Sequence, residues 1–118
     1  MSVSDNLKRG TVELVLLSLI AEEDMYGYQL SQALDARSKG EFALQEGSLY
    51  PTLYRMEQRG LISSRHFPVE NSKRFRVYYH LEPDGVDYLK KIKKEYAIIN
   101  RGIMSILGTE DFDDIDIE

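Results

Sequence analysis

Six side chains that can contact a polyanion are concentrated in two short segments of the chain. The first segment has two tyrosines and an arginine within six residues, and the second has three bases within four. Lysine and arginine neutralise phosphates, arginine also pairs with guanine edges, and tyrosine donates to phosphates or contacts thymine methyl groups. This is the chemistry of nucleic-acid contact, and its candidate residues are Tyr50, Tyr54, Arg55, Lys73, Arg74 and Arg76.

The formal charge of −5 is unusual for a protein that contacts nucleic acid, so the distribution of charge matters. Residues 108–118 contain six acids and no base, and the rest of the chain has 15 bases against 14 acids. Between Leu53 and His80 there are six bases and two acids. A basic segment therefore remains once the acidic C-terminal segment is set apart, although such a segment is also typical of ordinary solvated surface.

The chain offers little for catalysis or metal binding. It contains no cysteine, which excludes disulfides, thiolate metal sites and cysteine nucleophiles. The two histidines, His66 and His80, fall on two strand-like segments and could be cross-strand neighbours. Without a nearby carboxylate or third ligand they make a poor metal or acid–base site. The acids at 113, 114 and 116 lack the glycine and spacing of a calcium loop. We expect no enzyme, no cofactor and no metal.

The sequence predicts neither a membrane span nor a secretion signal. The most apolar run, residues 12–21, is well short of the roughly 20 residues that cross a bilayer, and it contains Glu13 and Ser18. Asp5 and the pair Lys8-Arg9 precede it, and no small-residue cleavage site follows. We expect a cytoplasmic protein with no membrane partner.

Three helices are expected in the first half of the chain. Thr11 can cap a helix over residues 12–21, in which apolar side chains recur every three or four residues, and the acids at 22–24 end it. A second helix is expected over residues 26–36. Gly40 then marks a turn, and Phe42 and Leu44 suggest a short extended piece.

The third helix contains the first of the two polyanion-contacting segments. Ser48 is expected as its N-cap, Pro51 lies in its first turn, and Gly60 fits the left-handed position that follows a helix. At 100° per residue, one side of this helix is apolar and the other is aromatic and basic. The apolar side has Leu49, Leu53 and Met56; the opposite side has Pro51, Tyr54, Arg55 and Gln58, with Tyr50 at its flank.

A hairpin and a last helix complete the chain. Residues 61–67 are a strand-like segment, and apolar and polar side chains alternate over residues 75–81, which predicts two strands joined by the polar turn 68–72. Pro83 is expected at the first position of the last helix. Apolar residues on that helix recur at spacings of 3, 4, 3, 4 and 3: Leu89, Ile92, Tyr96, Ile99, Ile103 and Ile106. This stripe favours a partner helix, because the preceding elements already have apolar faces of their own.

The order of these elements indicates a mainly α fold with a small β-hairpin, namely a winged helix-turn-helix plus a C-terminal dimerisation helix. We expect a DNA-binding domain over residues 1–82, a dimerisation helix over 83–107 and an acidic, disordered tail over 108–118. In such a fold the third helix enters the major groove and the hairpin, or wing, lies beside the duplex. A dimer would place two of these helices about 34–36 Å apart on a pseudo-palindromic operator.

Five segments of the chain resemble PadR-family transcriptional regulators, in particular the compact branch of that family. They are residues 9–20, 26–30, 46–57, 60–62 and 76–81, with Gly85 behind the last; Gly-Ser-Leu-Tyr-Pro-Thr-Leu at 47–53 is the most specific. The resemblance implies a homodimer formed through the last helix with help from the first. It also implies that the third helix binds the operator through Ser48, Tyr50, Pro51, Tyr54 and Arg55.

The resemblance further implies a repressor that is released by a small aromatic or hydrophobic effector, since family members respond to phenolic acids or flat hydrophobic drugs. Compact drug-binding members stack ligands between aromatic side chains of the two terminal helices. In those members one of the aromatic side chains is a tryptophan. Tyr96 stands at about the same place on the last helix, but this chain has no tryptophan. Tyr96 therefore fits a ligand pocket and plain dimer packing equally well. The wing also departs from the family, with Asn71 and Ser72 where two glycines are common.

A winged helix that contacts only protein, with no role on DNA, is the alternative function. The net acidity favours it, whereas the exposed tyrosine and arginine positions and the basic wing favour DNA. Salt dependence distinguishes the two, because binding through several phosphates weakens steeply as salt rises.

Overall fold

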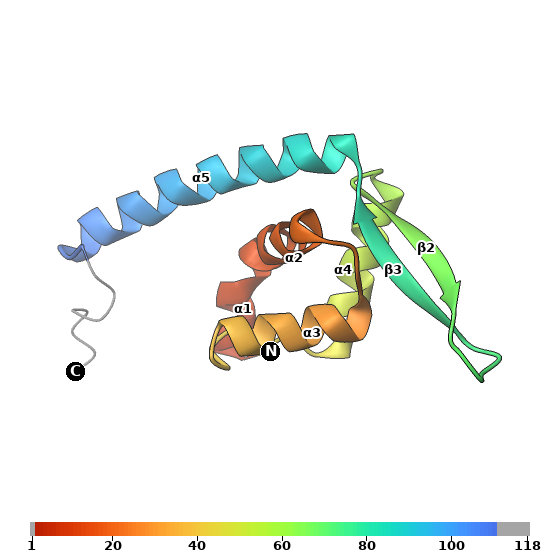
Figure 1. Ribbon diagram of the computed structural model, residues 1–118. Coiled ribbons are helices and arrows are strands. Elements are labelled where there is room, and N and C mark those ends of the chain that lie inside the picture. Colours follow the sequence, from red (N-terminus) through yellow and green to blue (C-terminus); the bar gives the residue numbers. More distant parts are fainter. Residues whose placement is uncertain (1, 111–118) are drawn as a thin grey trace.

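Helices make up most of the computed structural model, which describes residues 2–110, and a small sheet lies at one side (Figure 1). The helices are α1 (Val3–Lys8), α2 (Val12–Glu22), α3 (Gly27–Arg37), α4 (Glu46–Gln58) and α5 (Pro83–Leu107), and the 3-10 turn η1 (Arg9–Thr11) joins the first two. The strands are β1 (Met25–Tyr26), β2 (Ile62–Pro68) and β3 (Phe75–Leu81). The fold is mainly α with a small sheet, as expected.

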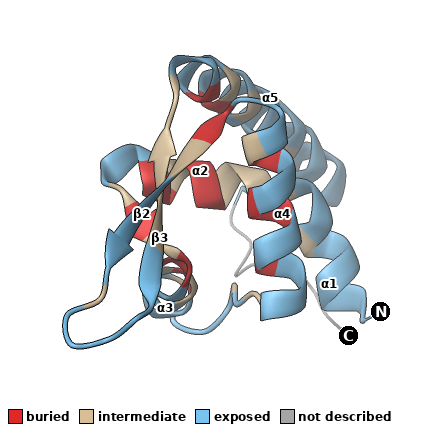
Figure 2. Cartoon of the chain, turned by 90° about the vertical axis from the view of Figure 1, so that its right-hand side faces the viewer, coloured by how far each residue is buried: buried red, intermediate tan, exposed pale blue. Residues whose placement is uncertain are grey.

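The core lies where the apolar faces of α2, α3 and α4 meet the start of β2. Seven of its large side chains are less than 2% exposed: Leu16, Leu17, Leu30, Leu49, Leu53, Met56 and Ile62. Full burial of such a side chain contributes roughly 1.5–3 kcal/mol. Figure 2 colours the buried segments of α2, α4 and the start of the sheet in red. The predicted inner side of the third helix is therefore correct.

The sheet has three antiparallel strands in the order β1–β3–β2, one more than the hairpin expected from the sequence. The extra strand has two residues, and its buried Met25 lies opposite Tyr79. The backbone N–H of Tyr26 donates to Gln29 Oε1 (3.1 Å), so α3 begins at Gly27 and not at Tyr26. The hairpin is present as expected, with β3 at the expected residues 75–81 and β2 shifted by one residue to Ile62–Pro68.

The chain before α2 is also helical, which the sequence analysis did not predict. The side chain of Ser2 caps α1 by accepting from the backbone N–H of Asp5 (3.1 Å). Thr11 occupies the expected N-cap position of α2, but its side chain makes no capping hydrogen bond, because η1 carries the backbone from α1 directly into α2. The Thr11 hydroxyl instead donates to the carbonyl of Lys8 (2.8 Å).

The loop between α3 and α4, residues 38–45, contains no strand, so the extended piece expected at Phe42 and Leu44 is wrong. Ser38 holds this loop, because its Oγ accepts from the backbone N–H of Phe42 (2.8 Å). Phe42 and Leu44 pack against the core while partly exposed. Their apolar character reflects this packing and not β pairing.

The start of α4 also differs from the expectation. Gln45 is the N-cap, and its carbonyl accepts from the backbone N–H of Ser48 (2.9 Å), so Ser48 lies inside the helix. Pro51 consequently lies beyond the first turn, where its missing N–H deprives the carbonyl of Gly47 of the usual helical donor. The end of the helix is as predicted, because Gly60 has the left-handed φ of 74°.

α5 begins at Pro83, as expected, and ends before Gly108, which has a φ of 76°. Its first turns pack on α2, and its distal half extends beyond the other elements in Figure 1. The molecule is therefore 55 Å long and 29 Å by 24 Å across. Within residues 2–110, no helix is long and apolar enough to cross a membrane. Most of the acidic tail, residues 111–118, lies outside the described residues.

The start of α5 packs so closely on the segment after α4 that position 85 has no room for a side chain. A Cβ there would lie 2.0 Å from the carbonyl oxygen of Leu61 and 2.6 Å from Leu81 Cδ1. Because a backbone oxygen cannot rotate aside, Gly85→Ala should lower the free energy of unfolding by about 2 kcal/mol. Urea denaturation measures this. Gly102→Ala is the control, since position 102 is open and helical and alanine there should stabilise by up to about 1 kcal/mol. Equal midpoints for the two variants would contradict the packing argument.

Candidate nucleic-acid interface

The outer side of α4 is exposed along its length. Tyr54 is 62% exposed, whereas the neighbouring Leu53 is fully buried, so the helix divides sharply between core and solvent. All five residues that were expected to face DNA on this helix are exposed: Ser48, Tyr50, Pro51, Tyr54 and Arg55. Together they offer hydroxyl donors, aromatic rings and one cation to a partner, which is what a groove-reading helix requires.

Arg55 is anchored to its own helix by a buried threonine. The Thr52 hydroxyl donates to the carbonyl of Ser48 (2.8 Å), and Arg55 Nη2 donates to Thr52 Oγ1 (3.2 Å). Thr52 is only 5% exposed, so this anchor is itself held in place. A guanidinium has five N–H donors. One anchoring bond therefore orients the side chain and leaves donors for a phosphate or a guanine edge.

Tyr50 lies at the contact between α3 and α4, with its ring over Gly27. A Cβ at position 27 would lie 2.4 Å from Tyr50 Oη and 2.7 Å from Cε1 and Cζ. Gly27 is buried, whereas the tyrosine is 44% exposed. The missing side chain at position 27 thus sets where the Tyr50 ring is presented on the helix surface.

We expect Gly27→Ala to weaken operator binding with little effect on stability. The clashing atoms are the far end of a flexible side chain, so the Tyr50 ring rotates away and the unfolding free energy changes by less than about 1 kcal/mol. Operator affinity should fall about tenfold, because the contact made by the Tyr50 ring is displaced. Fluorescence anisotropy measures this, and in a Tyr50→Ala background the glycine change should add nothing. A full additional loss in that background would show that Gly27 acts independently of Tyr50.

The tip of the wing presents Lys73 and Arg74. Both are exposed in the turn, where the N–H of Val69 donates to the Arg74 carbonyl (3.0 Å) and the N–H of Arg74 donates to Ser72 Oγ (3.0 Å). Asn71 has a φ of 60°, a left-handed conformation that asparagine tolerates better than most residues. Asn71 and Ser72, which stand where two glycines are common in the family, therefore form a tight turn, the first by its backbone conformation and the second by its hydrogen bond.

Arg76 does not accompany the two bases at the tip. Its guanidinium carbon lies 4.7 Å from the ring centroid of Tyr26. Tyr26 packs edge-on against Tyr78, and Tyr78 packs edge-on against Phe67, each pair with ring centroids 5.3 Å apart. This row of rings fixes Arg76 on one face of the sheet. Arg65, opposite Tyr78 in the register, is a base on the wing that the sequence analysis left unassigned.

A groove of about 470 Å³ lies beside the first half of α4 and includes two bases that were not assigned to DNA contact. Its charged and hydroxyl-bearing lining is Asp5, Lys8, Arg9, Glu13, Ser48, Thr52 and Arg55. Lys8 Nζ donates to the carbonyl of Ala43 (2.7 Å), which ties α1 to the loop before α4. The adjacent pair Lys8-Arg9 was the only signal in the sequence, and placing it here required knowledge of α1.

The two histidines are not cross-strand neighbours, contrary to the expectation. His80 lies opposite Ser63, and His66 lies opposite Val77, three positions further along β2. Because side chains alternate between the faces of a strand, the two imidazoles lie on opposite faces of the sheet. His80 also has a carboxylate partner that was not anticipated, since its Nδ1 lies 2.8 Å from Asp24 Oδ1.

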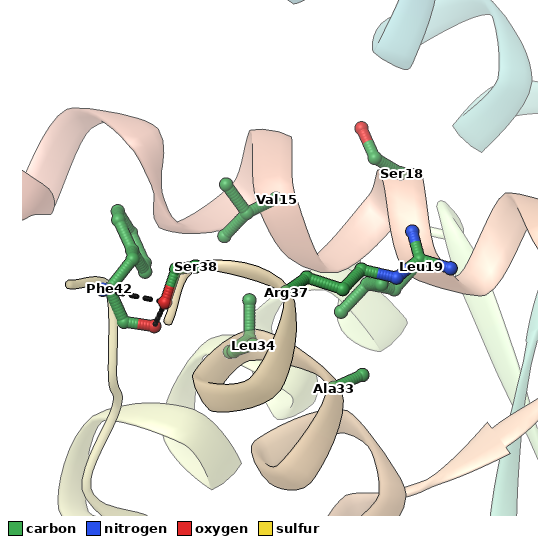
Figure 3. A pocket seen from close by; sticks show the side chains of 8 residues that line it. All are labelled: Val15, Ser18, Leu19, Ala33, Leu34, Arg37, Ser38 and Phe42. Atoms are coloured by element: carbon green, nitrogen blue, oxygen red, sulfur yellow. Dashed lines mark hydrogen bonds between the residues drawn. The ribbon is translucent and has the colours of Figure 1, made fainter. Parts of the chain in front are cut away.

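A second hollow, of about 280 Å³, lies between α2 and α3 (Figure 3). It is lined by Val15, Ser18, Leu19, Ala33, Leu34, Arg37, Ser38 and Phe42. Arg37 forms a two-pronged ion pair with Glu22, and this hydrogen bonding holds the pKa of Glu22 below its usual value. Tyr96, the expected effector contact, is not part of this lining. The sequence analysis missed the hollow, because it is formed by two helices and a loop.

The apolar stripe on α5 divides into a covered and a bare part. Leu89 is 5% exposed, and Ile92 packs partly buried against the core. Further along, the exposed fractions are 46% for Tyr96, 57% for Ile99, 45% for Ile103 and 86% for Ile106. A row of exposed apolar side chains on a projecting helix is typical of a protein contact surface.

Comparison with known proteins gives consistent matches to one family. The model of the PadR-like family of transcriptional regulators matches residues 16–91. The transcriptional regulator Rv3488 of Mycobacterium tuberculosis is 37% identical over 97 residues, which cover 82% of this chain and 86% of that protein.

Solved structures agree with these matches. A transcriptional regulator from Clostridium thermocellum has a TM-score of 0.78 and 32% identity, covering 85% of this chain and 96% of its own. A PadR family transcriptional regulator from Eggerthella lenta has a TM-score of 0.77 and 27% identity, covering 89% of this chain and 88% of its own. The architecture is thus the winged helix of these regulators.

Proposed function

The chain belongs to the PadR-like family of transcriptional regulators, and from this premise we propose that it is a homodimeric repressor of a pseudo-palindromic operator. The family consists of DNA-binding regulators and not of enzymes. The observation that carries the proposal is the division of α4, whose inner leucines are 0–1% exposed while Tyr54 on its outer side is 62% exposed. That outer side enters the major groove.

We assign the DNA contacts to two surfaces. On α4 they are Ser48, Tyr50, Pro51, Tyr54 and Arg55, and on the wing they are Lys73, Arg74 and Arg76. The wing tip neutralises phosphates beside the groove that α4 reads, while Arg76 acts from the sheet face where Tyr26 holds it. A dimer spaces two such sets one helical turn apart, about 34–36 Å.

The dimer forms through α5. Residues 1–82 act as the DNA-binding unit and residues 83–107 as the dimerisation helix, with the bare part of the stripe covered by the second copy. Exposed apolar side chains on α1, Val3 and Leu7 at 76% each, are suited to extend this contact. Covering these side chains removes apolar surface from water, which drives dimerisation.

The repressor is released by a small aromatic or hydrophobic effector in the cytoplasm. Two places suit such a ligand: the dimer centre, where Tyr96 is 46% exposed, and the hollow between α2 and α3. At the dimer centre the two copies of Tyr96 offer aromatic surface to a flat molecule. We retain Tyr96 as the candidate contact.

A winged helix that contacts only protein remains the second candidate. The observation in its favour is the wing, where Phe67 is 50% and Phe75 is 63% exposed. Exposed aromatic residues are enriched in protein interfaces. An interface built on them would respond weakly to salt, unlike one built on phosphate contacts.

The test is selection of genomic DNA fragments on the purified protein, followed by a salt titration on the enriched fragment. Enrichment of one palindromic fragment with an affinity that falls steeply with salt supports the repressor. No enrichment at low salt by a folded dimer, both before and after removal of bound small molecules, contradicts it and favours the protein-contact alternative.

A further inference from the structure

Three side chains join the end of α4, the proposed recognition helix, to the start of α5, the proposed dimerisation helix. Arg59 follows α4, Glu13 lies on α2 and Tyr88 lies on α5. Arg59 Nη1 donates to Glu13 Oε2 (2.8 Å), and the Tyr88 hydroxyl donates to Glu13 Oε1 (2.6 Å). The guanidinium carbon of Arg59 also lies 4.8 Å from the centroid of the Tyr88 ring. Each member therefore contacts both others.

The network is charge-assisted and only partly open to water. The side chains of Arg59 and Glu13 are 46% and 27% exposed. The Tyr88 hydroxyl and the Glu13 carboxylate raise the pKa of Arg59 above its ordinary value, so the arginine stays charged. Hydrogen bonds to charged groups are stronger and more directional than neutral ones. The three side chains thus favour one relative position of α2, the end of α4 and the start of α5.

Backbone contacts make the same junction stiff. The N–H groups of Arg59 and Leu61 donate to carbonyls of α4 (3.1 Å and 3.0 Å), so this segment moves with the helix. The Leu61 carbonyl accepts from the N–H of Glu82 (3.0 Å), immediately before α5. Gly85 packs against that same carbonyl. A change in the tilt of α5 therefore also moves α4, because both helices are attached to the segment that contains the Leu61 carbonyl.

We propose that Glu13, Arg59 and Tyr88 are positioning residues that fix the angle between α4 and α5, and thereby the half-site spacing that the dimer accepts. The inference rests on the proposed function, since it requires a dimer on DNA. In such a dimer α5 is shared with the second copy, so the α4–α5 angle in each protomer determines where both recognition helices lie. A stiff angle selects one spacing of half-sites, and a loose angle tolerates others.

The expected effect follows from DNA geometry. One inserted base pair between half-sites moves them apart by about 3.4 Å and rotates one by about 35° around the duplex. A rigid dimer cannot place both copies of α4 on such an operator and loses the contacts to one half-site. A dimer with a loosened α4–α5 junction can rotate its two copies of α4 and keep the contacts to both half-sites.

The experiment measures the ratio of the Kd for an operator with one inserted base pair to the Kd for the selected operator. Tyr88→Phe keeps the ring beneath Arg59 and removes only the hydroxyl bond, and Glu13→Gln removes the charge that binds Arg59. We expect the ratio to fall about threefold in Tyr88→Phe and about tenfold in Glu13→Gln. Affinity for a single isolated half-site should stay within about twofold of the parent.

Tyr28→Phe is the matched control, because Tyr28 is 60% exposed on α3 and lies outside the junction. A variant that is merely less stable lowers the active fraction for both operators, which leaves the ratio unchanged. A parent-like ratio in both Tyr88→Phe and Glu13→Gln overturns the inference while leaving the repressor intact. Failure of the parent protein to bind any palindromic fragment overturns the proposed function and the inference with it.

Discussion

Ile99→Asp should separate the proposed dimer and raise its dissociation constant at least about 100-fold. Ile99 is 57% exposed in the single chain and lies in the bare part of the α5 stripe. On dimerisation the substitution removes apolar burial from both copies and places an unpaired carboxylate in each half of the contact. Operator affinity should fall with it by a factor of about 10² or more, because two linked half-site contacts become independent.

Light scattering and sedimentation measure the separation, and circular dichroism verifies that α5 remains helical. Ile98→Asp is the matched control. Ile98 is the adjacent residue, is 46% exposed, and lies about 100° around the helix from Ile99, away from the stripe. It should leave the dimer nearly unchanged. A folded Ile99→Asp protein that remains dimeric would show that the stripe is not the dimer contact.

Helices and their buried sides could be predicted because the information is local. The 3.6-residue period identified the side of α4 that holds Leu49, Leu53 and Met56, all now found buried. Gly60 and Pro83 marked helix ends because their backbone preferences depend on their own residue type. These features depend on local residue type and spacing and not on tertiary contacts.

Features that depend on distant residues were missed. β1 has only two residues and exists because it pairs with β3, more than fifty residues later, so no periodicity can reveal it. The opposite faces of His66 and His80 depend on the hairpin register, which the sequence left open. At α4 the serine resembled an N-cap, but Gln45 takes that position because the helix extends one turn further towards the loop.

The candidate interface was predictable as a list of exposed residues but not as an arrangement. Exposure of Tyr54 and Arg55 followed from the helical period. The placement of Arg76 on Tyr26 did not, because the two residues are fifty positions apart and meet only through β1. The same holds for Tyr88 and Glu13, which are separated by 75 positions. Sequence patterns thus identify surfaces, whereas the connections that orient them require the fold.

Arg55→Ala should weaken operator binding at least about 30-fold without changing the dimer. Arg55 is exposed on α4 and is oriented by Thr52, so its loss leaves the core and the α5 stripe untouched. A single arginine contact with a base or phosphate contributes about 1–3 kcal/mol, and each dimer loses two of them. The unfolding free energy should change by less than about 0.5 kcal/mol, as for other exposed positions.

Fluorescence anisotropy on the selected operator measures the loss, with Lys90→Ala as the control, because it removes an equal charge from an exposed position on α5 outside the proposed DNA-contact surfaces. The pattern of the loss identifies what Arg55 contacts. A uniform loss across operator variants, with a shallower salt dependence, indicates phosphate; relaxed preference at one base pair indicates a guanine edge. Equal affinity of Arg55→Ala and the parent protein would mean that α4 does not read the operator with this side, because a cation lost twice from a groove contact must weaken binding.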